Sequence, residues 1–181
     1  MRKVVATEYL SLDGVFQEPG EWSFPFWSDQ AAKFKFDELL ASDALLLGRL
    51  TYQGFAAAWP KMERDPGGFA DRMNGLPKYV ASRTLRKLDW NNSRLIEGDL
   101  GDAVRKLKLE PGNDILIGGS GDVVNELLEA DLIDELRIML HPIVLGGGKR
   151  LFRDGAKKTL GLTKTSQLGN GVVVLYYEPA R

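Results

Sequence analysis

The sequence contains no cysteine and only one histidine, His141, among 181 residues. The absence of cysteine excludes disulfide bonds and thiolate metal sites. A single histidine nearly excludes a zinc site and a Ser-His-Asp triad as well. Because His141 precedes Pro142 in an apolar stretch, we interpret it as a structural residue, and we predict no metal site.

An excess of charge of either sign is also missing, since the net charge is −1 at pH 7. Nucleic-acid-binding proteins usually carry a clustered basic face, so we expect no nucleic-acid partner. No apolar run reaches the roughly 20 residues needed to span a membrane. The N-terminus also lacks the apolar region, about 7–15 residues long, of a signal peptide. We therefore expect a cytoplasmic protein with no membrane contact.

The composition, with 44% hydrophobic and 27% charged residues, is ordinary for a globular protein, and the length suits one domain over residues 1–181. Strand-like and helix-like segments alternate along the chain. The predicted strands are Val4–Leu10, Ala44–Leu47, Tyr79–Ala81, Leu95–Glu97, Ile115–Ile117 and Glu135–Leu145. The predicted helices are Gln30–Ala41, Tyr52–Trp59, Phe69–Met73 within a loop over residues 60–76, Leu100–Leu107 and a segment after Gly121. This alternation predicts a three-layer α/β fold whose mostly parallel sheet is covered by helices on both faces.

The C-terminal part has a different pattern. Leu162–Leu168 and Val172–Glu178 are strand-like and flank Gly169-Asn170-Gly171. Asparagine and glycine tolerate the positive φ of hairpin turns. We therefore predict an antiparallel hairpin that closes the sheet.

Aromatic residues gather in one segment, Val15–Ser28, which follows the turn at Asp13-Gly14. They are Phe16, Trp22, Phe24, Phe26 and Trp27. Such side chains could stack on a flat ligand ring as part of a lid. Packing on the core as a plug is an equally good interpretation, and the sequence favours neither.

The segment Ile115–Asp134 runs from an apolar strand through glycines into an amphipathic helix. Gly118, Gly119 and Gly121 leave the backbone uncovered where the strand ends, and Ser120 or Asp122 is suited to cap the helix. Free N–H groups and the helix dipole favour a phosphate at such a place. The third glycine of the dinucleotide fingerprint is missing, however, so a tight turn without function is an equal alternative for this segment alone.

Two other strand ends carry groups that suit phosphate. Gly48-Arg49-Leu50-Thr51 follows one predicted strand, and Ser82-Arg83-Thr84 follows the next. Arginine donates two parallel hydrogen bonds to phosphate, and open α/β sheets bind ligands at the carboxyl ends of their strands. Taken singly, Thr51 could be a helix cap and Arg83 a surface residue. Together with the glycine turn, these groups favour a pocket for a ligand with several phosphates.

A set of motifs in this chain follows the order found in a known family. They are Ser11-Leu12-Asp13-Gly14, Gly48-Arg49-x-Thr51-Tyr52, Val80-x-Ser82-Arg83-Thr84-Leu85, Ile117-Gly118-Gly119-Ser120, Leu132-Ile-Asp134-Glu135-Leu136 and Pro142-Ile-Val-Leu-Gly146-Gly-Gly-Lys149-Arg-Leu-Phe152. In these motifs, which cover nearly the whole chain, the protein resembles the reductase domain of the bifunctional riboflavin-biosynthesis deaminase–reductases. That domain has the dihydrofolate-reductase-like fold.

The resemblance implies NADPH as the cofactor. The cofactor-binding residues that it implies are Gly48, Arg49, Thr51, Ser82, Arg83, Thr84, Gly118, Gly119, Ser120 and Gly121. The motif at residues 48–51 would contact the cofactor phosphates, and the motif at residues 82–84 the adenosine ribose with its 2′-phosphate. The glycine turn would let the backbone approach the pyrophosphate and the nicotinamide.

The chain also departs from the bifunctional family and from dihydrofolate reductase. The deaminase zinc site needs cysteine, so we expect the reductase step only, and the substrate could differ. A dihydrofolate reductase holds the pterin with a carboxylate on the helix before Gly48. This chain has Ala32 near that position, with Asp29 and Asp37 within reach, which argues against folate.

The reduction also needs a proton. Asp13 is the first candidate donor and Asp37 the second, and water is as good a source as either. We therefore expect an NADPH-dependent reductase of a small heterocyclic or carbonyl substrate, such as the ribosylamino-pyrimidine of riboflavin synthesis. The alternatives are a nucleotide-binding protein without turnover and a dihydrofolate-reductase-like activity on a pterin. The resemblance, with the apolar stretch Ile138–Leu145, also implies a homodimer.

Overall fold

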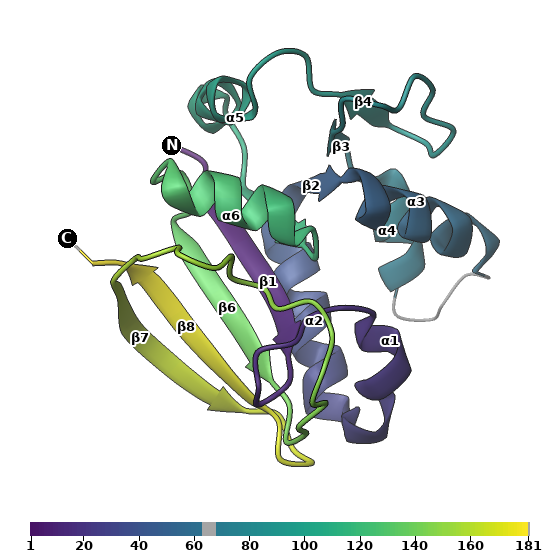
Figure 1. Cartoon of the computed structure of the whole chain (residues 1–181). Coiled ribbons are helices and arrows are strands. Elements are labelled where there is room, and N and C mark those ends of the chain that lie inside the picture. The colour runs from purple at the N-terminus through teal and green to yellow at the C-terminus, as the bar shows by residue number, and fades with distance from the viewer. Residues whose placement is uncertain (63–67, 181) are drawn as a thin grey trace.

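A computed structural model describes residues 1–62 and 68–180, and it contains a sheet of eight strands (Figure 1). The strands are β1 (Val4–Leu10), β2 (Ser42–Gly48), β3 (Lys78–Ala81), β4 (Ser93–Leu95), β5 (Asp114–Gly118), β6 (Glu135–Leu140), β7 (Leu160–Gln167) and β8 (Val173–Pro179). The α-helices are α1 (Pro19–Trp22), α2 (Asp29–Ala41), α3 (Arg49–Ala58), α4 (Phe69–Gly75), α5 (Leu100–Leu109) and α6 (Gly121–Glu129). Short 3-10 helices cover Phe24–Phe26 and Trp59–Lys61.

The strands lie in the order β4-β3-β2-β5-β1-β6-β8-β7. All neighbours from β4 to β6 are parallel, whereas β8 is antiparallel to both β6 and β7. The hairpin turn at Gly169, Asn170 and Gly171 has φ values of 78°, 51° and 79°. The predicted fold, a mostly parallel sheet closed by a C-terminal antiparallel hairpin, is therefore confirmed.

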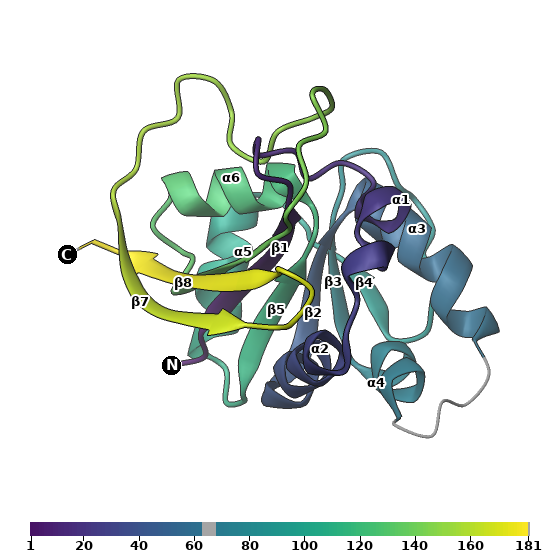
Figure 2. The same cartoon turned by 90° about the horizontal axis from the view of Figure 1, so that it is seen from below.

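Helices cover both faces of the sheet. Helices α5 and α6 lie on one face, and α2, α3 and α4 lie on the other (Figures 1 and 2). The alternation of side chains in β1 explains this arrangement. Val4, Ala6 and Leu10 pack in the core under α5 and α6, whereas Val5 packs with α2 and α3 and Tyr9 packs with α2 and β8. The three layers expected from the alternation of elements are all present.

Local chemistry accounts for the helix starts. The Ser28 hydroxyl accepts a hydrogen bond from the Ala31 N–H at 3.0 Å at the start of α2. The Asp99 carboxylate accepts one from the Asp102 N–H at 2.9 Å at the start of α5. Both are N-caps of the usual kind. In the described part of the chain, no helix combines the length and the apolar character that crossing a membrane requires.

Most predicted segments have somewhat different bounds in the structure. The strand predicted at Leu95–Glu97 is β4 (Ser93–Leu95), and the helix predicted at Tyr52–Trp59 is α3 (Arg49–Ala58). β6 ends at Leu140 rather than at Leu145. The His141 N–H still donates to the Leu10 carbonyl of β1 at 2.8 Å, but Pro142 has no N–H for the ladder, and the Ile143 N–H turns back to the His141 carbonyl at 2.8 Å. The short helix predicted at Phe69–Met73 is α4. The predicted loop over residues 60–76 lies partly outside the described residues, at 63–67.

Candidate functional site

The connections of the sheet point to one place for a ligand. β1 leads through α2 on one face to β2, whereas the neighbouring β5 leads through α6 on the opposite face to β6. Adjacent strands whose connections leave in opposite directions form a topological switch point, where open α/β sheets bind ligands at the carboxyl ends. The pairing of β1 with β5 ends there with Thr7 opposite Gly118.

A direct contact joins two loops at this edge. Ser120 Oγ accepts a hydrogen bond from the Gly48 N–H at 2.7 Å and donates one to Thr51 Oγ1 at 2.8 Å. The start of α6 is thereby held against the start of α3. Ser120 occupies the N-cap position of α6, but its hydroxyl makes no cap hydrogen bond there. The predicted cap is therefore wrong for Ser120, because the hydroxyl is already engaged with the β2–α3 turn.

The glycines of these loops are needed for this close packing. A Cβ atom on Gly48 would lie 3.2 Å from Ser120 Oγ, and one on Gly119 would lie 3.2 Å from Thr51 Oγ1. Gly119 also has a φ of 76°, which side-chain-bearing residues rarely adopt. Larger residues would push the two helix starts apart.

Two exposed guanidinium groups lie at the same edge. β2 pairs with β3 up to Gly48 opposite Ala81, so Arg49 and Ser82 follow side by side. Arg49 is exposed, and its Nη1 lies 3.3 Å from Gln53 Oε1. Arg83 is exposed too, and within residues 1–62 and 68–180 neither arginine has a carboxylate partner. Both groups are available to an anion.

The loop after β3 is closed by its own hydroxyl groups. Ser82 Oγ accepts hydrogen bonds from the N–H groups of Leu85 at 3.0 Å and Thr84 at 3.2 Å. Thr84 is exposed, and its hydroxyl lies 3.5 Å from that of Ser82. The three predicted cofactor motifs thus end on neighbouring strands at one edge, and the contacts assigned to their residues stay predictions.

Gly121 is covered by an aromatic ring. A Cβ atom on this glycine would lie 2.5 Å from Phe16 Cζ, so the ring packs directly on the first turn of α6. Other aromatic residues of that segment pack around the buried His141, whose ring centroid is 5.2 Å from that of Trp22 and 6.1 Å from that of Phe26. Burial lowers the pKa of His141, which therefore stays neutral. Much of the segment packs as a plug, whereas Phe24 and Trp27 are exposed.

Asp13 is bound into a loop junction. Its carboxylate accepts hydrogen bonds from Ser11 Oγ at 2.6 Å, the Gly146 N–H at 2.8 Å and the Leu145 N–H at 3.1 Å. These hydrogen bonds, led by that of Ser11, lower the pKa of Asp13 to about 2. The group is therefore ionised at neutral pH and has no proton to donate. The role of Asp13 as the proton source stays a prediction, and these surroundings argue against it.

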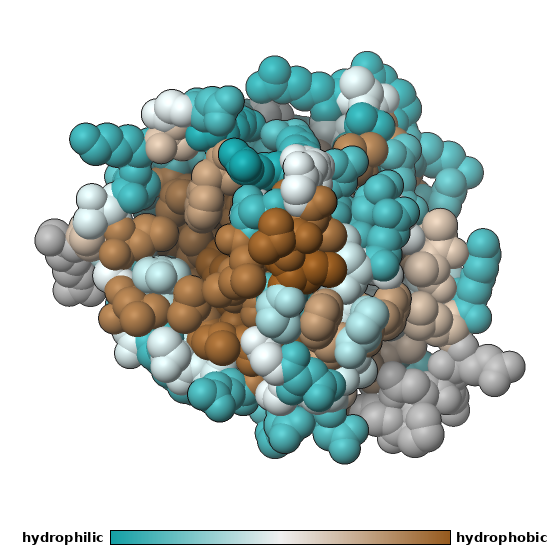
Figure 3. Space-filling model, turned by 60° about the horizontal axis from the view of Figure 1, so that its bottom comes forward, coloured by the Kyte–Doolittle hydropathy of each residue, from teal (hydrophilic) through white to brown (hydrophobic). Residues whose placement is uncertain are grey.

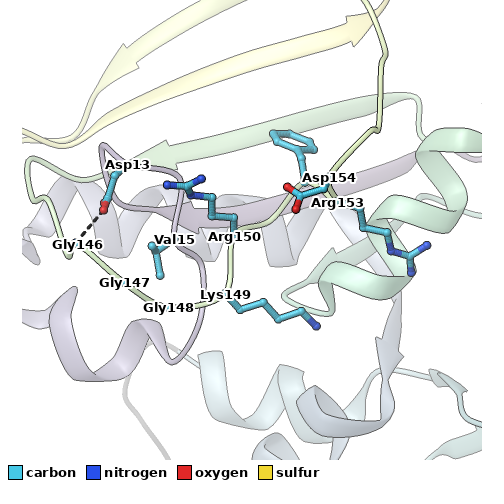
Figure 4. Close-up of a pocket in the computed structure, with 10 residues that line it drawn as sticks. Asp13, Val15, Gly146, Gly147, Gly148, Lys149, Arg150, Arg153 and Asp154 are labelled. Carbon is cyan, nitrogen blue, oxygen red and sulfur yellow. Dashed lines mark hydrogen bonds between the residues drawn. The ribbon is translucent and has the colours of Figure 1, made fainter.

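A cavity of about 420 Å³ lies between the Asp13 loop and residues 146–154 (Figure 4). Three basic side chains line it, those of Lys149, Arg150 and Arg153. Two of them reach Asp122 on α6, Arg153 Nη2 at 3.3 Å and Lys149 Nζ at 3.7 Å. Their positive charge is thereby partly neutralised within the protein.

Helix α2 turns different residues inward from those that the sequence suggested. Asp37 is exposed and pairs with Lys33 at 2.6 Å, and Asp29 is exposed in the first turn. The inward groups are Lys35 and Glu38, whose Nζ and Oε2 atoms are 2.7 Å apart. Glu38 Oε1 also lies 3.2 Å from Arg137 Nη1 on β6. Lys35 and Glu38 are at helical spacing from Ala31 and Leu39, the apolar residues of the inward face. This spacing could have identified them as inward residues from the sequence.

Glu8 is a further group that the sequence prediction missed. It points to the α6 face of β1 between Ala6 and Leu10, and it is 2% exposed. Its Oε1 has no hydrogen-bond partner within the described residues. Burial raises its pKa to about 8, offset in part by Lys35 and by the Gly119 N–H. A carboxylic acid on the core face of an apolar strand was the available signal.

The chain is similar to several known proteins. The family model for the RibD C-terminal domain matches residues 2–174. The uncharacterized protein YyaP of Bacillus subtilis (strain 168) is 30% identical over 97% of this chain and 94% of its own length. A putative riboflavin biosynthesis protein from Shewanella sp. PV-4 has a TM-score of 0.80 at 23% identity, over 99% of both chains. Dihydrofolate reductase from Enterococcus faecalis, complexed with NADP(H), has a TM-score of 0.62 at 15% identity, over 99% of this chain and 97% of its own. These two structures share the fold.

Proposed function

The chain belongs to the RibD C-terminal domain family, and from that premise we propose that it is an oxidoreductase that uses NADPH. The proposed reaction is the reduction of a small heterocyclic substrate, of the kind that the reductases of riboflavin biosynthesis act on. The structural neighbour from Enterococcus faecalis, with the same fold, is complexed with NADP(H). That neighbour and the geometry of the switch point support the proposal.

The main structural support for NADPH binding is the contact that Ser120 makes between two loops. Ser120 holds the first turns of α3 and α6 together at the switch point, through hydrogen bonds of 2.7 Å and 2.8 Å. Two helix N-termini at one edge present free N–H groups and two positive dipole ends. A pyrophosphate carries the complementary charge. The Ser120 contact therefore builds a place suited to the middle of a dinucleotide.

The remaining residues fit the ends of such a ligand. Arg49 and Arg83 have no carboxylate partner in the described ranges. Arg49 would bind the cofactor phosphates, and Arg83 the additional phosphate of NADPH. The bound dinucleotide would supply the hydride. The protein would hold donor and acceptor carbons in line, an effect worth roughly 7–11 kcal/mol in favourable cases.

A pterin is a poorer substrate for this site than a pyrimidine. In dihydrofolate reductase the preceding helix supplies a free carboxylate to the pterin. Here Glu38 is the inward carboxylate of α2, and both of its oxygens are engaged, by Lys35 at 2.7 Å and by Arg137 at 3.2 Å. Asp29 and Asp37 are exposed. The inward face of α2 therefore offers no free carboxylate to a pterin.

Cofactor binding tests the proposal. We expect the protein to bind NADPH more tightly than NADH, measured by quenching of tryptophan fluorescence. Arg83→Gln should weaken NADPH binding about tenfold, the equivalent of ~1.4 kcal/mol, and leave NADH binding unchanged. Arg105→Gln is the matched control, since Arg105 is an exposed arginine of α5 paired with Asp102. Equal affinity for the two cofactors, or equal losses in both variants, would contradict the proposal.

Turnover separates an enzyme from a protein that only binds the nucleotide. Consumption of NADPH with a panel of pyrimidines and pterins should be fastest with a ribosylamino-pyrimidine. Binding of NADPH without consumption with any member of the panel would favour a non-catalytic role.

We also propose a homodimer. Apolar side chains gather on one face of the molecule (Figure 3). Leu12 and Val144 belong to adjacent loops, joined by a hydrogen bond from the Leu12 N–H to the Ile143 carbonyl at 2.8 Å, and both side chains are exposed. A second copy would remove such surface from water. A monomeric mass in sedimentation equilibrium would contradict the dimer.

A further inference from the structure

Glu8 lies at the switch point itself. The last pair between β1 and β5 is Thr7 opposite Gly118, whereas β1 continues to pair with β6 through Glu8 opposite Ile138. Glu8 is therefore the first residue of β1 beyond the end of β5, next to the loop that begins at Gly119. Its main-chain position coincides with the edge at which α/β sheets bind ligands.

The carboxyl group of Glu8 is buried without being fully satisfied. Its exposed fraction is 2%, and Oε1 lacks a hydrogen-bond partner in the described part of the chain. Buried polar atoms are paired in the great majority of cases, and an exception is explained by a catalytic role, by strain, or by a bound water or ion. At the switch point, an atom of a bound ligand would supply the partner that Oε1 lacks.

The charged groups around Glu8 do not offset the cost of ionising its buried carboxyl group. Lys35 is the one cation that lowers its pKa, and the Nζ atom of Lys35 is already bound to Glu38 Oε2 at 2.7 Å and lies 3.3 Å from Thr7 Oγ1. Tyr9 and Glu38 are the other titratable groups coupled to Lys35, and Arg137 faces Glu38 from β6. Because burial outweighs this shared cation, Glu8 keeps its proton at neutral pH.

Asp13 is a clear contrast at the end of the same strand. Its carboxylate accepts three hydrogen bonds and has a pKa of about 2. A proton donor must carry its proton at the working pH and must be able to reach the reacting atoms. Of these two acids, Glu8 carries the proton, and it lies at the edge of the sheet that the Ser120 contact also marks.

We propose that Glu8 is a catalytic residue, whose carboxyl group contacts the nicotinamide end of the bound dinucleotide and supplies the proton that accompanies the hydride. This inference rests on the proposed function. In the step, a C–H bond forms at the substrate carbon as one breaks in the cofactor, which is thereby oxidised. The substrate nitrogen or oxygen takes the proton of Glu8, whose O–H bond breaks, and Glu8 regains a proton from water.

The charge change in the cofactor favours this transfer. The oxidised nicotinamide ring carries one more positive charge than the reduced ring. A positive charge within about 4–6 Å of a carboxyl group stabilises the ionised form and lowers its pKa by roughly 1–3 units. Glu8 would therefore hold its proton beside the reduced cofactor and lose it more readily beside the oxidised one.

This coupling is measurable without a substrate. The dissociation constants of NADP⁺ and NADPH are measured by calorimetry from about pH 6.5 to about pH 9.5. We expect the preference for NADP⁺ over NADPH to rise about tenfold or more over this range, because a shift of one pKa unit corresponds to a factor of about ten in affinity. Titrations of groups common to both cofactor forms cancel in the ratio.

Variants assign the effect to Glu8. Glu8→Gln should abolish the change in the ratio while still binding both cofactors, and Asp13→Asn should retain it. A ratio that is independent of pH in the wild-type protein would overturn the inference, whether or not the Glu8 variant folds. So would the same pH dependence in Glu8→Gln. If the wild-type protein binds neither cofactor form, the proposed function itself fails, which is a distinct result.

Discussion

Two buried ionisable groups, Lys78 and Glu8, have nearly the same pKa and opposite surroundings. Burial lowers the pKa of Lys78 to about 8 and raises that of Glu8 to about 8. The Lys78 ammonium donates to the carbonyls of Leu76 at 2.7 Å, Asn74 at 2.9 Å and Asn91 at 3.0 Å. It also lies 4.2 Å from the centroid of the Trp90 ring. Glu8 has an oxygen without any partner in the described residues.

The difference shows that a shifted pKa does not by itself mark a functional group. All three donors of Lys78 are used within the protein, which is the pattern of a residue that stabilises its neighbourhood. Glu8 has an unused oxygen, and its place in β1 is at the edge of the sheet where the chain connections diverge. Hydrogen-bond satisfaction, together with position, separates a structural charge from a catalytic one.

The largest effect should follow from removing Lys78. Lys78→Met would remove the buried ammonium that donates to the carbonyls of Asn74, Leu76 and Asn91, and we expect the free energy of unfolding to fall by about 3–5 kcal/mol. Urea denaturation at neutral pH measures this loss. Glu8→Gln, the matched change at the other site, should cause little loss. Equal losses in the two variants would contradict the distinction drawn between the sites.

The next effect concerns the pH dependence of stability. The pKa of Glu8 is raised from 4.5 to about 8 on folding, so the folded state binds more protons than the unfolded state between these values. Its contribution to stability is complete below about pH 4.5 and is lost as the pH rises through about 8. In the wild-type protein we expect the free energy of unfolding to decline by about 2–4 kcal/mol over that range because of Glu8, and Glu8→Gln should remove this decline.

The pKa shift of Lys78 should change stability with pH in the opposite direction. Its pKa is lowered from 10.5 to about 8, so the unfolded state binds more protons between these values, and stability should rise with pH over that range. Urea denaturation across the full range checks both slopes. A wild-type profile that is flat from about pH 4.5 to about pH 8 would contradict the account of Glu8.

A smaller effect is expected at Gly119, which connects Glu8 with the Ser120 contact. Gly119→Ala would place a Cβ atom 3.2 Å from Thr51 Oγ1 in a backbone with a φ of 76°. We expect a loss of about 1–2 kcal/mol in stability and a higher pKa for Glu8, because its N–H partner would move. Gly54→Ala is the control, since a Cβ atom there meets nothing within 4 Å. Equal stability in the two variants would argue against the tight approach of the two loops.

The smallest effect is expected at Asp13, where a substitution should leave NADPH binding unchanged. Asp13→Asn would weaken the acceptors for the N–H groups of Leu145 and Gly146, so we expect faster hydrogen exchange of these amides. The pKa of Asp13 is lowered from 3.8 to about 2, so the contribution of the carboxylate is present above about pH 4 and lost as the pH falls through about 2. A loss of NADPH affinity in this variant would contradict its assignment to the loop junction.

Local patterns in the sequence were sufficient for most of the fold. The alternation in Val4–Leu10 and the turn residues at Gly169-Asn170-Gly171 depend on neighbours in the chain, and the structure confirmed both elements. The end of β6 was less predictable. It depends on Pro142 and on the hydrogen bond from the Ile143 N–H back to the His141 carbonyl, a turn that a run of apolar residues does not reveal.

The candidate site was only partly predictable for the same reason. The glycine turn and the two arginine motifs were recognisable as residue types that suit phosphate. The role of Ser120 was not, because it requires β2 and β5 to be neighbours. The inward position of Glu8 follows from its parity in β1, whereas its unpartnered oxygen depends on the packing of several distant elements.

NMR titration of the Glu8 side-chain carboxyl carbon reports the protonation state of this group without any substrate. With Glu8→Gln used for assignment, we expect a resonance that titrates near pH 8 in the free protein. Addition of NADP⁺ should lower this pKa by about one unit or more, and NADPH should not lower it. A resonance that titrates at the ordinary value of about 4.5, or one that neither cofactor form shifts, would contradict the placement of a catalytic acid at Glu8.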